Sequence, residues 1–86
     1  MNIETLITKA HEKRFSGDII GAVELYLQAA HQGSGHAAHE LGVIYITGGE
    51  GLEPNFEKSQ YWLNKSLESG FESTIASDPE WFKKTT

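Results

Sequence analysis

Two stretches of the chain, residues 18–33 (DIIGAVELYLQAAHQG) and 55–70 (NFEKSQYWLNKSLESG), follow one pattern and decide the fold. Each begins with a residue that commonly caps a helix, carries an apolar pair near its middle and ends at glycine. They align by residue class without gaps and begin about 37 residues apart, within the period of about 20–50 residues that marks stacked repeats. Stacked helical repeats usually bind other proteins, so the pattern predicts a repeat fold with an interaction role.

The composition indicates one small globular domain and disfavours several kinds of partner and site. The 86 residues carry a net charge of -5 and contain no cysteine. Nucleic-acid affinity depends on concentrated Lys and Arg, so an acidic chain disfavours it. The short basic patch of Lys9, Lys13 and Arg14, interrupted by Glu12, is expected to be a solvated helix face. The lack of cysteine excludes disulfides, thiolate nucleophiles and cysteine-based zinc sites.

The sequence also lacks the apolar segments of membrane and secreted proteins. No stretch approaches the roughly 20 consecutive apolar residues of a membrane span. The N-terminal stretch carries Glu4 and has no apolar run of signal-peptide length. We therefore expect no membrane contact and, by default, a cytoplasmic location.

Apolar residues recur at helical spacing along the chain, which predicts an all-α fold. Gly42 lies beside the apolar stripe of the third helix, which suggests that a neighbouring helix approaches its backbone closely. The glycine-rich segment before Pro54 is expected to be a loop in which Leu52 turns inward. The predicted helices cover about residues 2–15, 18–33, 34–47 and 55–69.

The C-terminal part of the chain is expected to complete the core. Residues 78–80, Asp-Pro-Glu, are a helix-start signal, because aspartate caps a helix and proline suits its first position. The short helix that they open holds Trp81 and Phe82, which we expect to cover the exposed apolar side of the last repeat. The helix before it is expected to be anchored in the core by Phe56, Trp62, Leu63 and Leu67.

A set of positions in the second half of the chain follows one known repeat pattern: Gly33, Ala37, Leu41-Gly42, Tyr45, the glycine loop 49–52, Lys58-Ser59, Trp62-Leu63, Lys65-Ser66 and Gly70. In these positions the chain resembles a Sel-one-like repeat, a relative of the tetratricopeptide repeat. It departs from the pattern where Gly48 lengthens the loop by one residue and where Asn55 replaces the common aspartate. Residues 2–33 resemble a degenerate first repeat.

The resemblance implies a short right-handed α/α superhelix of two antiparallel helix pairs with a concave face and a short C-terminal capping helix. It also implies an adaptor, a scaffold or an inhibitor rather than a catalyst. We expect a single domain over residues 1–86. It consists of a degenerate repeat over about 2–33, a Sel-one-like repeat over about 34–70 and a capping segment over 71–86.

The four histidines raise the question of a metal site. His36 and His39 share a helical face with Glu40, so a third ligand would complete a zinc site. Their order along the helix matches neither zinc-protease motif, so we expect these histidines to face solvent or a partner. No serine lies on the strand-turn-helix elbow of a nucleophile. The sequence therefore predicts no metal, no cofactor and no enzyme; a metal-dependent hydrolase is the alternative from a different class.

The first helix of each pair is expected to line the inner curve of the stack, where a protein partner would bind. The polar, acidic and histidine character of its outward positions suits a polar or basic partner surface. Histidines there would make binding sensitive to pH near neutrality. The expected partner-binding residues are Glu4, Thr8 and His11 on the first helix and His36, His39, Glu40 and Val43 on the third.

The predicted function and the predicted oligomeric state each have one alternative. The favoured function is a non-enzymatic protein–protein interaction module of the adaptor or scaffold type. A small acidic repeat protein also resembles an inhibitor that neutralises a toxic enzyme, as bacterial immunity proteins do.

Two repeats fall below the three or so that usually give a self-sufficient stack. Either the terminal helix completes the core or a second copy does, so a homodimer is an alternative to a monomer.

Overall fold

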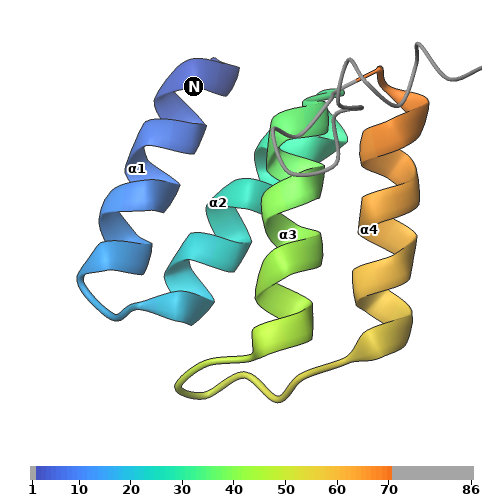
Figure 1. Cartoon of the computed structure of the whole chain (residues 1–86). Coiled ribbons are helices and arrows are strands. Elements are labelled where there is room, and N and C mark those ends of the chain that lie inside the picture. The colour runs from blue at the N-terminus through green and yellow to red at the C-terminus, as the bar shows by residue number, and fades with distance from the viewer. Residues whose placement is uncertain (1, 71–86) are drawn as a thin grey trace, which may run out of the picture.

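Four α-helices of 13 residues each form the part of the chain that the structure describes, residues 2–70. In this computed structural model the helices are α1 (Ile3–Phe15), α2 (Ile19–His31), α3 (Gly35–Thr47) and α4 (Phe56–Glu68). α1 packs antiparallel to α2, α3 packs antiparallel to α4, and α2 packs against α3 (Figure 1). The predicted all-α fold of two antiparallel pairs is confirmed. The predicted capping helix with Trp81 and Phe82 lies outside the described residues.

Each helix is preceded by a residue whose side chain accepts a hydrogen bond from a backbone N–H group that has no acceptor within the helix. The side-chain oxygens of Asn2, Asp18, Ser34 and Asn55 each accept a hydrogen bond from the backbone N–H three residues on, at 2.7–3.0 Å. Such caps are typically worth about 1 kcal/mol each. Because the caps lie in the sequence itself, they explain why the helix starts could be predicted closely.

Small residues let the helices of the core approach one another. Ala10, Ala22, Ala29 and Ala37 are fully buried in one cluster with Tyr26, which is the largest fully buried side chain over residues 2–70. Protein interiors combine small and large side chains in this way to reach close packing. The other buried members of the core are Leu6, Val23, Leu41, Ile44 and Tyr45.

The contact between α3 and α4 is close enough to depend on a glycine. A Cβ atom at Gly42 would lie 2.5 Å from Cδ2 of Leu63, so only glycine fits without movement. The Oγ atom of Ser59 donates a hydrogen bond to the carbonyl oxygen of Gly42 at 2.7 Å. The predicted close approach at Gly42 is therefore confirmed, and the buried line of α4 runs through Ser59 and Ser66.

The expected anchors of α4 are only partly right. Trp62 and Leu63 are partly buried, but Phe56 and Leu67 are 68% and 66% exposed. Their spacing suggested a core stripe, whereas the tight contact with α3 admits small side chains such as Ser59 instead. Phe56 and Leu67 consequently lie on a flank of α4 that no described helix covers.

The loop between α3 and α4 is a compact turn and not a loose spacer. Gly49 and Leu52 exchange two backbone hydrogen bonds at 2.9 and 3.0 Å, and Leu52 packs against the core as predicted. The backbone N–H of Asn55 donates to the carbonyl oxygen of Tyr45 at 2.7 Å, which ties the start of α4 to the end of α3. A Cβ atom at Gly49 would lie 2.8 Å from Cγ1 of Ile19, so the loop also lies directly on α2.

None of the helices over residues 2–70 is long and apolar enough to cross a membrane.

Candidate functional site

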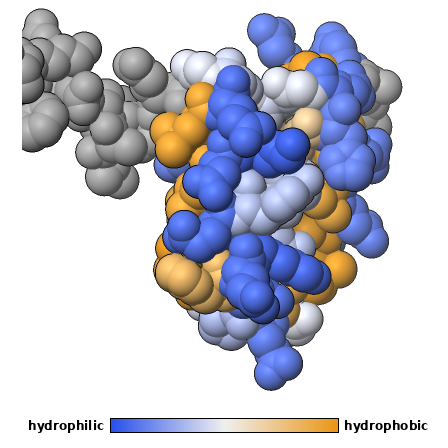
Figure 2. Space-filling model, turned by 90° about the vertical axis from the view of Figure 1, so that its right-hand side faces the viewer, coloured by the Kyte–Doolittle hydropathy of each residue, from blue (hydrophilic) through white to orange (hydrophobic). Residues whose placement is uncertain are grey.

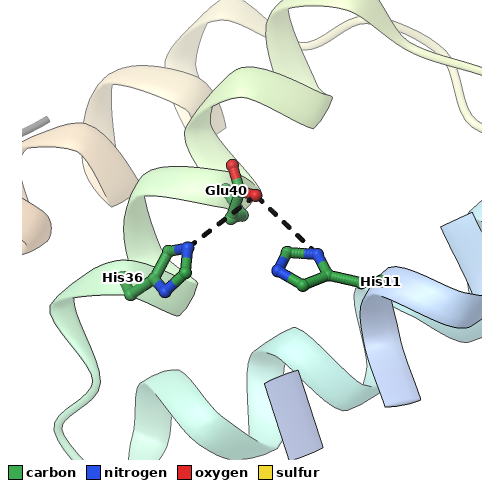
Figure 3. A group of neighbouring side chains, drawn as sticks. All are labelled: His11, His36 and Glu40. Carbon is green, nitrogen blue, oxygen red and sulfur yellow. Dashed lines mark ion pairs between the residues drawn. The ribbon is translucent and has the colours of Figure 1, made fainter. Parts of the chain in front are cut away.

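Polar side chains of α1 and α3 meet on one side of the molecule, and we call this group the Glu40 cluster. It consists of His11 and Arg14 on α1, Tyr26 on α2, and His36, His39 and Glu40 on α3. Residues three or four apart on a helix share a face, so α1 and α3 each present a short row of side chains to the other. The cluster therefore joins the first helix pair to the second (Figure 3).

The Glu40 carboxylate lies at the centre of the cluster, with 17% of its side chain exposed. Its Oε2 atom is 3.5 Å from a guanidinium nitrogen of Arg14 and 4.0 Å from both Nδ1 of His11 and Nε2 of His36. Its Oε1 atom is 3.8 Å from Nδ1 of His39. Since Arg14 is always charged, its guanidinium is the permanent counter-ion of this carboxylate, and each histidine adds charge only when protonated.

Tyr26 connects the buried core to the cluster. Its hydroxyl is hydrogen-bonded to Nδ1 of His11 at 2.5 Å, and the two rings meet edge to face. Burial raises the pKa of Tyr26 above its usual value, and the nearby Glu40 charge raises it further, while Arg14 lowers it. The phenol therefore keeps its proton at neutral pH, and its hydrogen bond fixes the orientation of the His11 ring.

The cluster has the residue types of a metal site but contains a competing cation. One ligand atom each from His11, His36 and Glu40 lies within 4.8 Å of the other two (Figure 3). The sequence suggested His36 and His39 as the ligand pair, whereas the structure brings His36 next to His11 from the other repeat. Because Arg14 already faces the Glu40 oxygen that lies nearest both histidines, the arrangement fits an ion-pair network better than a metal centre.

A family model described as the Sel1 repeat matches residues 13–34 and 35–71. The chain belongs to the Sel1 repeat family. No curated protein and no solved structure matches it. Sel1 repeats are typically non-catalytic modules for protein–protein interaction, so the family supports an interaction role without naming a partner.

The structure separates the predicted partner-binding residues of the two Sel1 repeats into two groups and leaves Val43 apart from both. Glu4 and Thr8 lie exposed on α1 and make no contact with the Glu40 cluster in the described interactions. His11, His36, His39 and Glu40 belong to the cluster, and the contacts of His11 with Glu40 and His36 join the two repeats. Val43 is partly buried on α3, one turn beyond His39.

Two members of the cluster were not predicted for this site. Arg14 was expected to be solvated, but its side chain is 29% exposed and paired with Glu40. Tyr26 was expected to be a core residue only, and it is fully buried with its hydroxyl bonded to His11. Arg14 follows His11 by three residues on the helix that faces Glu40, and this spacing was the signal in the sequence that could have found it.

Proposed function

We propose that this Sel1 repeat protein is a non-enzymatic adaptor that binds a protein partner along the side of the molecule formed by α1 and α3. The observation that carries the proposal is that side chains of α1 and α3 meet directly in the Glu40 cluster, which makes the two helices one continuous surface. The typical role of Sel1 repeats supports the same conclusion.

The chemistry of this surface favours a polar or basic partner. Glu4 is exposed and lacks a cation in the described ion pairs, and the chain as a whole carries a net charge of -5. The Glu40 charge is largely compensated by Arg14, so Glu40 acts on the partner less than the sequence suggested. Exposed polar groups around a well-packed patch select partners more by charge and shape than by buried area.

The cluster also prepares the surface for binding. The ion pair between Arg14 and Glu40 holds α1 to α3, and the hydrogen bond from Tyr26 of α2 holds the His11 side chain of α1 in place, before a partner arrives. A surface that is ordered in advance loses less entropy on binding, which improves affinity.

Site-specific photo-crosslinking tests the surface, since the chain has no cysteine and a single introduced cysteine takes the reagent. We expect Thr8→Cys on α1 and Val43→Cys on α3, each labelled with a benzophenone, to capture the same protein. The matched control is Gln28→Cys, at an exposed position of α2. Equal capture by the control would contradict binding along α1 and α3.

The identity of the captured protein separates the two kinds of interaction role. If the captured protein is an enzyme that loses its activity in a one-to-one complex with this chain, the interaction is of the inhibitor type. A partner captured without loss of activity would indicate the adaptor type, which is the one we propose.

A further inference from the structure

A hollow opens at the end of the molecule where α1 and α3 both end. Its volume is about 620 Å³, and its lining includes Phe15 of α1, Ile19 of α2, and Thr47 and Gly48 at the end of α3. Figure 1 shows the C-terminal ends of α1 and α3 at the same end of the molecule as the loop between α3 and α4. A hollow of this size has room for a large side chain of a partner.

Phe15 gives the hollow an exposed aromatic wall. Phe15 is 90% exposed, whereas the other large apolar residues of α1, Ile3, Leu6 and Ile7, are buried or partly buried. Contact of an apolar ring with water is unfavourable, so covering this ring by an apolar group of a partner is favourable. Aromatic side chains that are covered in this way often supply much of the binding free energy of an interface.

The charged side chains around the inner part of the hollow are paired. Arg14 and Glu40 line it and form their ion pair at 3.5 Å, and Lys13 and Asp18 in the turn beside it pair at 3.6 Å. His11 also lines the hollow and carries a charge only when it is protonated. An apolar side chain can therefore enter without burying an unpaired carboxylate or guanidinium.

Glu50 supplies an uncompensated charge at the rim of the hollow. A Cβ atom at Gly49 would lie 2.8 Å from Cγ1 of Ile19, and one at Gly51 would lie 3.6 Å from Cγ1 of Ile20. The backbone of Glu50 between these glycines therefore lies over the start of α2, beside the hollow. Glu50 is exposed and has no cation among the ion pairs of residues 2–70. Since the ends of α1 and α3 add partial negative charge, the rim favours a cation over an anion.

We propose that this hollow anchors a segment of a protein partner in which a large apolar residue lies next to a lysine or arginine. The apolar side chain packs on Phe15 and Ile19, and the cation of its neighbour contacts Glu50. The long apolar stem of lysine or arginine lets the charge reach the rim across the apolar wall. This inference rests on the proposed binding side along α1 and α3, and it names the feature of the partner that this side recognises.

Exposed apolar residues occur on α4 as well, and they supply a control. Figure 2, which looks onto the α4 side of the molecule, shows hydrophobic surface on both sides of a hydrophilic column of side chains. Tyr61 of α4 is 53% exposed, and the ammonium group of Lys65 lies 5.6 Å from the centre of its ring. A cation of this chain thus already occupies the face of the Tyr61 ring, so Tyr61 is a matched comparison for Phe15.

Binding of short peptides, measured by NMR on the full chain, tests the proposal. Three peptides share a glycine–serine frame and carry leucine–lysine, leucine–glutamate or serine–lysine at their centre. We expect the leucine–lysine peptide to shift the amide signals of Phe15 and Gly48 until saturation, with a dissociation constant on the order of 1 mM, as two side chains allow. The other two peptides should bind at least about fivefold more weakly. No saturable shift with the leucine–lysine peptide, or equal binding of all three, would overturn the proposal.

Variants assign the two contacts. Phe15→Ser should weaken binding of the leucine–lysine peptide by about tenfold, and Glu50→Gln should reduce the preference for lysine over glutamate by about threefold. The matched controls Tyr61→Ser on α4 and Glu24→Gln on α2 should change neither value. All four positions are exposed, so we expect the fold to persist, and circular dichroism checks it. A control that changes binding as much as its test variant would overturn the assignment.

A failure of this inference can be told apart from a failure of the proposed function. In the photo-crosslinking with Thr8→Cys and Val43→Cys, addition of Phe15→Ser should reduce capture of the partner. Undiminished capture would overturn the anchor and leave binding along α1 and α3 in place. Equal capture by the control Gln28→Cys would instead contradict the binding side itself.

Discussion

Glu40 holds the two repeats together at the scale of single residues, since its carboxylate on α3 faces Arg14 and His11 on α1. Glu40→Gln leaves the partly buried Arg14 guanidinium without its counter-ion. We expect the free energy of unfolding to fall by about 1–2 kcal/mol, less than for a fully buried pair because both side chains keep some solvent. Urea denaturation followed by circular dichroism measures the change.

The matched control for Glu40 is Glu68, whose ion pair with Lys65 lies on the exposed surface of α4 at 3.7 Å. Glu68→Gln should lower the free energy of unfolding by about 0.5 kcal/mol or less, because exposed pairs three residues apart on a helix are weak. Similar losses for the two variants would show that the Glu40 cluster contributes no more than an ordinary surface ion pair.

Tyr26 is expected to make the free energy of unfolding depend on pH in the alkaline range. Its pKa is raised by burial and by Glu40, so the folded chain holds the phenol proton more tightly than the unfolded chain. The stabilisation from this proton is complete below pH of about 10 and is lost as the pH rises through the folded-state pKa. Tyr26→Phe should reduce the loss of stability above pH 10, while at neutral pH it removes the hydrogen bond to His11 and costs about 1 kcal/mol.

The test is the free energy of unfolding measured against pH for the unchanged chain and for Tyr26→Phe. Tyr61→Phe, at an exposed position, serves as the control and should keep the alkaline slope of the unchanged chain. A slope that Tyr26→Phe leaves unchanged would show that other groups cause the alkaline loss.

The members of the Glu40 cluster illustrate what the sequence can tell at this scale. His36, His39 and Glu40 could be placed on one face because their spacing along α3 is enough for that. Their contacts with His11 and Arg14 could not be predicted, because these depend on the distance between two helices that are far apart in sequence. The partial burial of Arg14 could not be predicted for the same reason.

At the scale of helices, Gly42 sets the separation of α3 and α4. A Cβ atom there would lie 2.5 Å from the Leu63 side chain and 3.3 Å from the backbone oxygen of Ser59. Alanine gains about 1 kcal/mol of helix propensity, but the forced movement of α4 should outweigh it. We expect Gly42→Ala to destabilise the fold by about 1–2 kcal/mol net.

Leu63→Ala supplies the comparison for this prediction, because it removes the atoms that the new methyl group meets. In a double-mutant cycle measured by urea denaturation, the loss from Gly42→Ala should be smaller in the Leu63→Ala background. Strictly additive losses would place the cause of any destabilisation elsewhere.

Helix bounds could be predicted closely, whereas the buried face of α4 could not. Caps such as Asn55 and turns such as Gly70 act through neighbouring residues, so they are visible in the sequence. Phe56 and Leu67 have the spacing of core residues, yet they are exposed in the described part of the chain. Burial depends on what lies opposite, and a helical pattern reports only which residues share a side.

For the molecule as a whole, the outer helices α1 and α4 differ in how much apolar surface they expose over residues 2–70. Stacked repeats gain stability from the contact of each repeat with its neighbours, and end repeats need a polar or covered outer side. On the α1 side, Glu4, Thr8, Lys9 and Glu12 supply exposed polar groups. On the α4 side the exposed residues include Phe56 and Leu67. The exposed side of α1 is thus mostly polar, with Phe15 as its exposed large apolar residue, whereas α4 exposes Phe56, Tyr61 and Leu67.

This asymmetry predicts the oligomeric state of a variant that cannot cover Phe56 and Leu67 on α4. We expect Trp81 and Phe82 to cover these two residues, so replacing both by serine should raise the mass measured by light scattering as concentration increases, because the apolar side of α4 becomes available to a second chain. The free energy of unfolding of the monomer should also fall, by about 1–3 kcal/mol, as buried apolar area is lost. Ile20→Ser, which removes an exposed apolar residue of α2, should do neither. An unchanged chain that is already a dimer at low concentration would instead indicate that the second copy completes the stack.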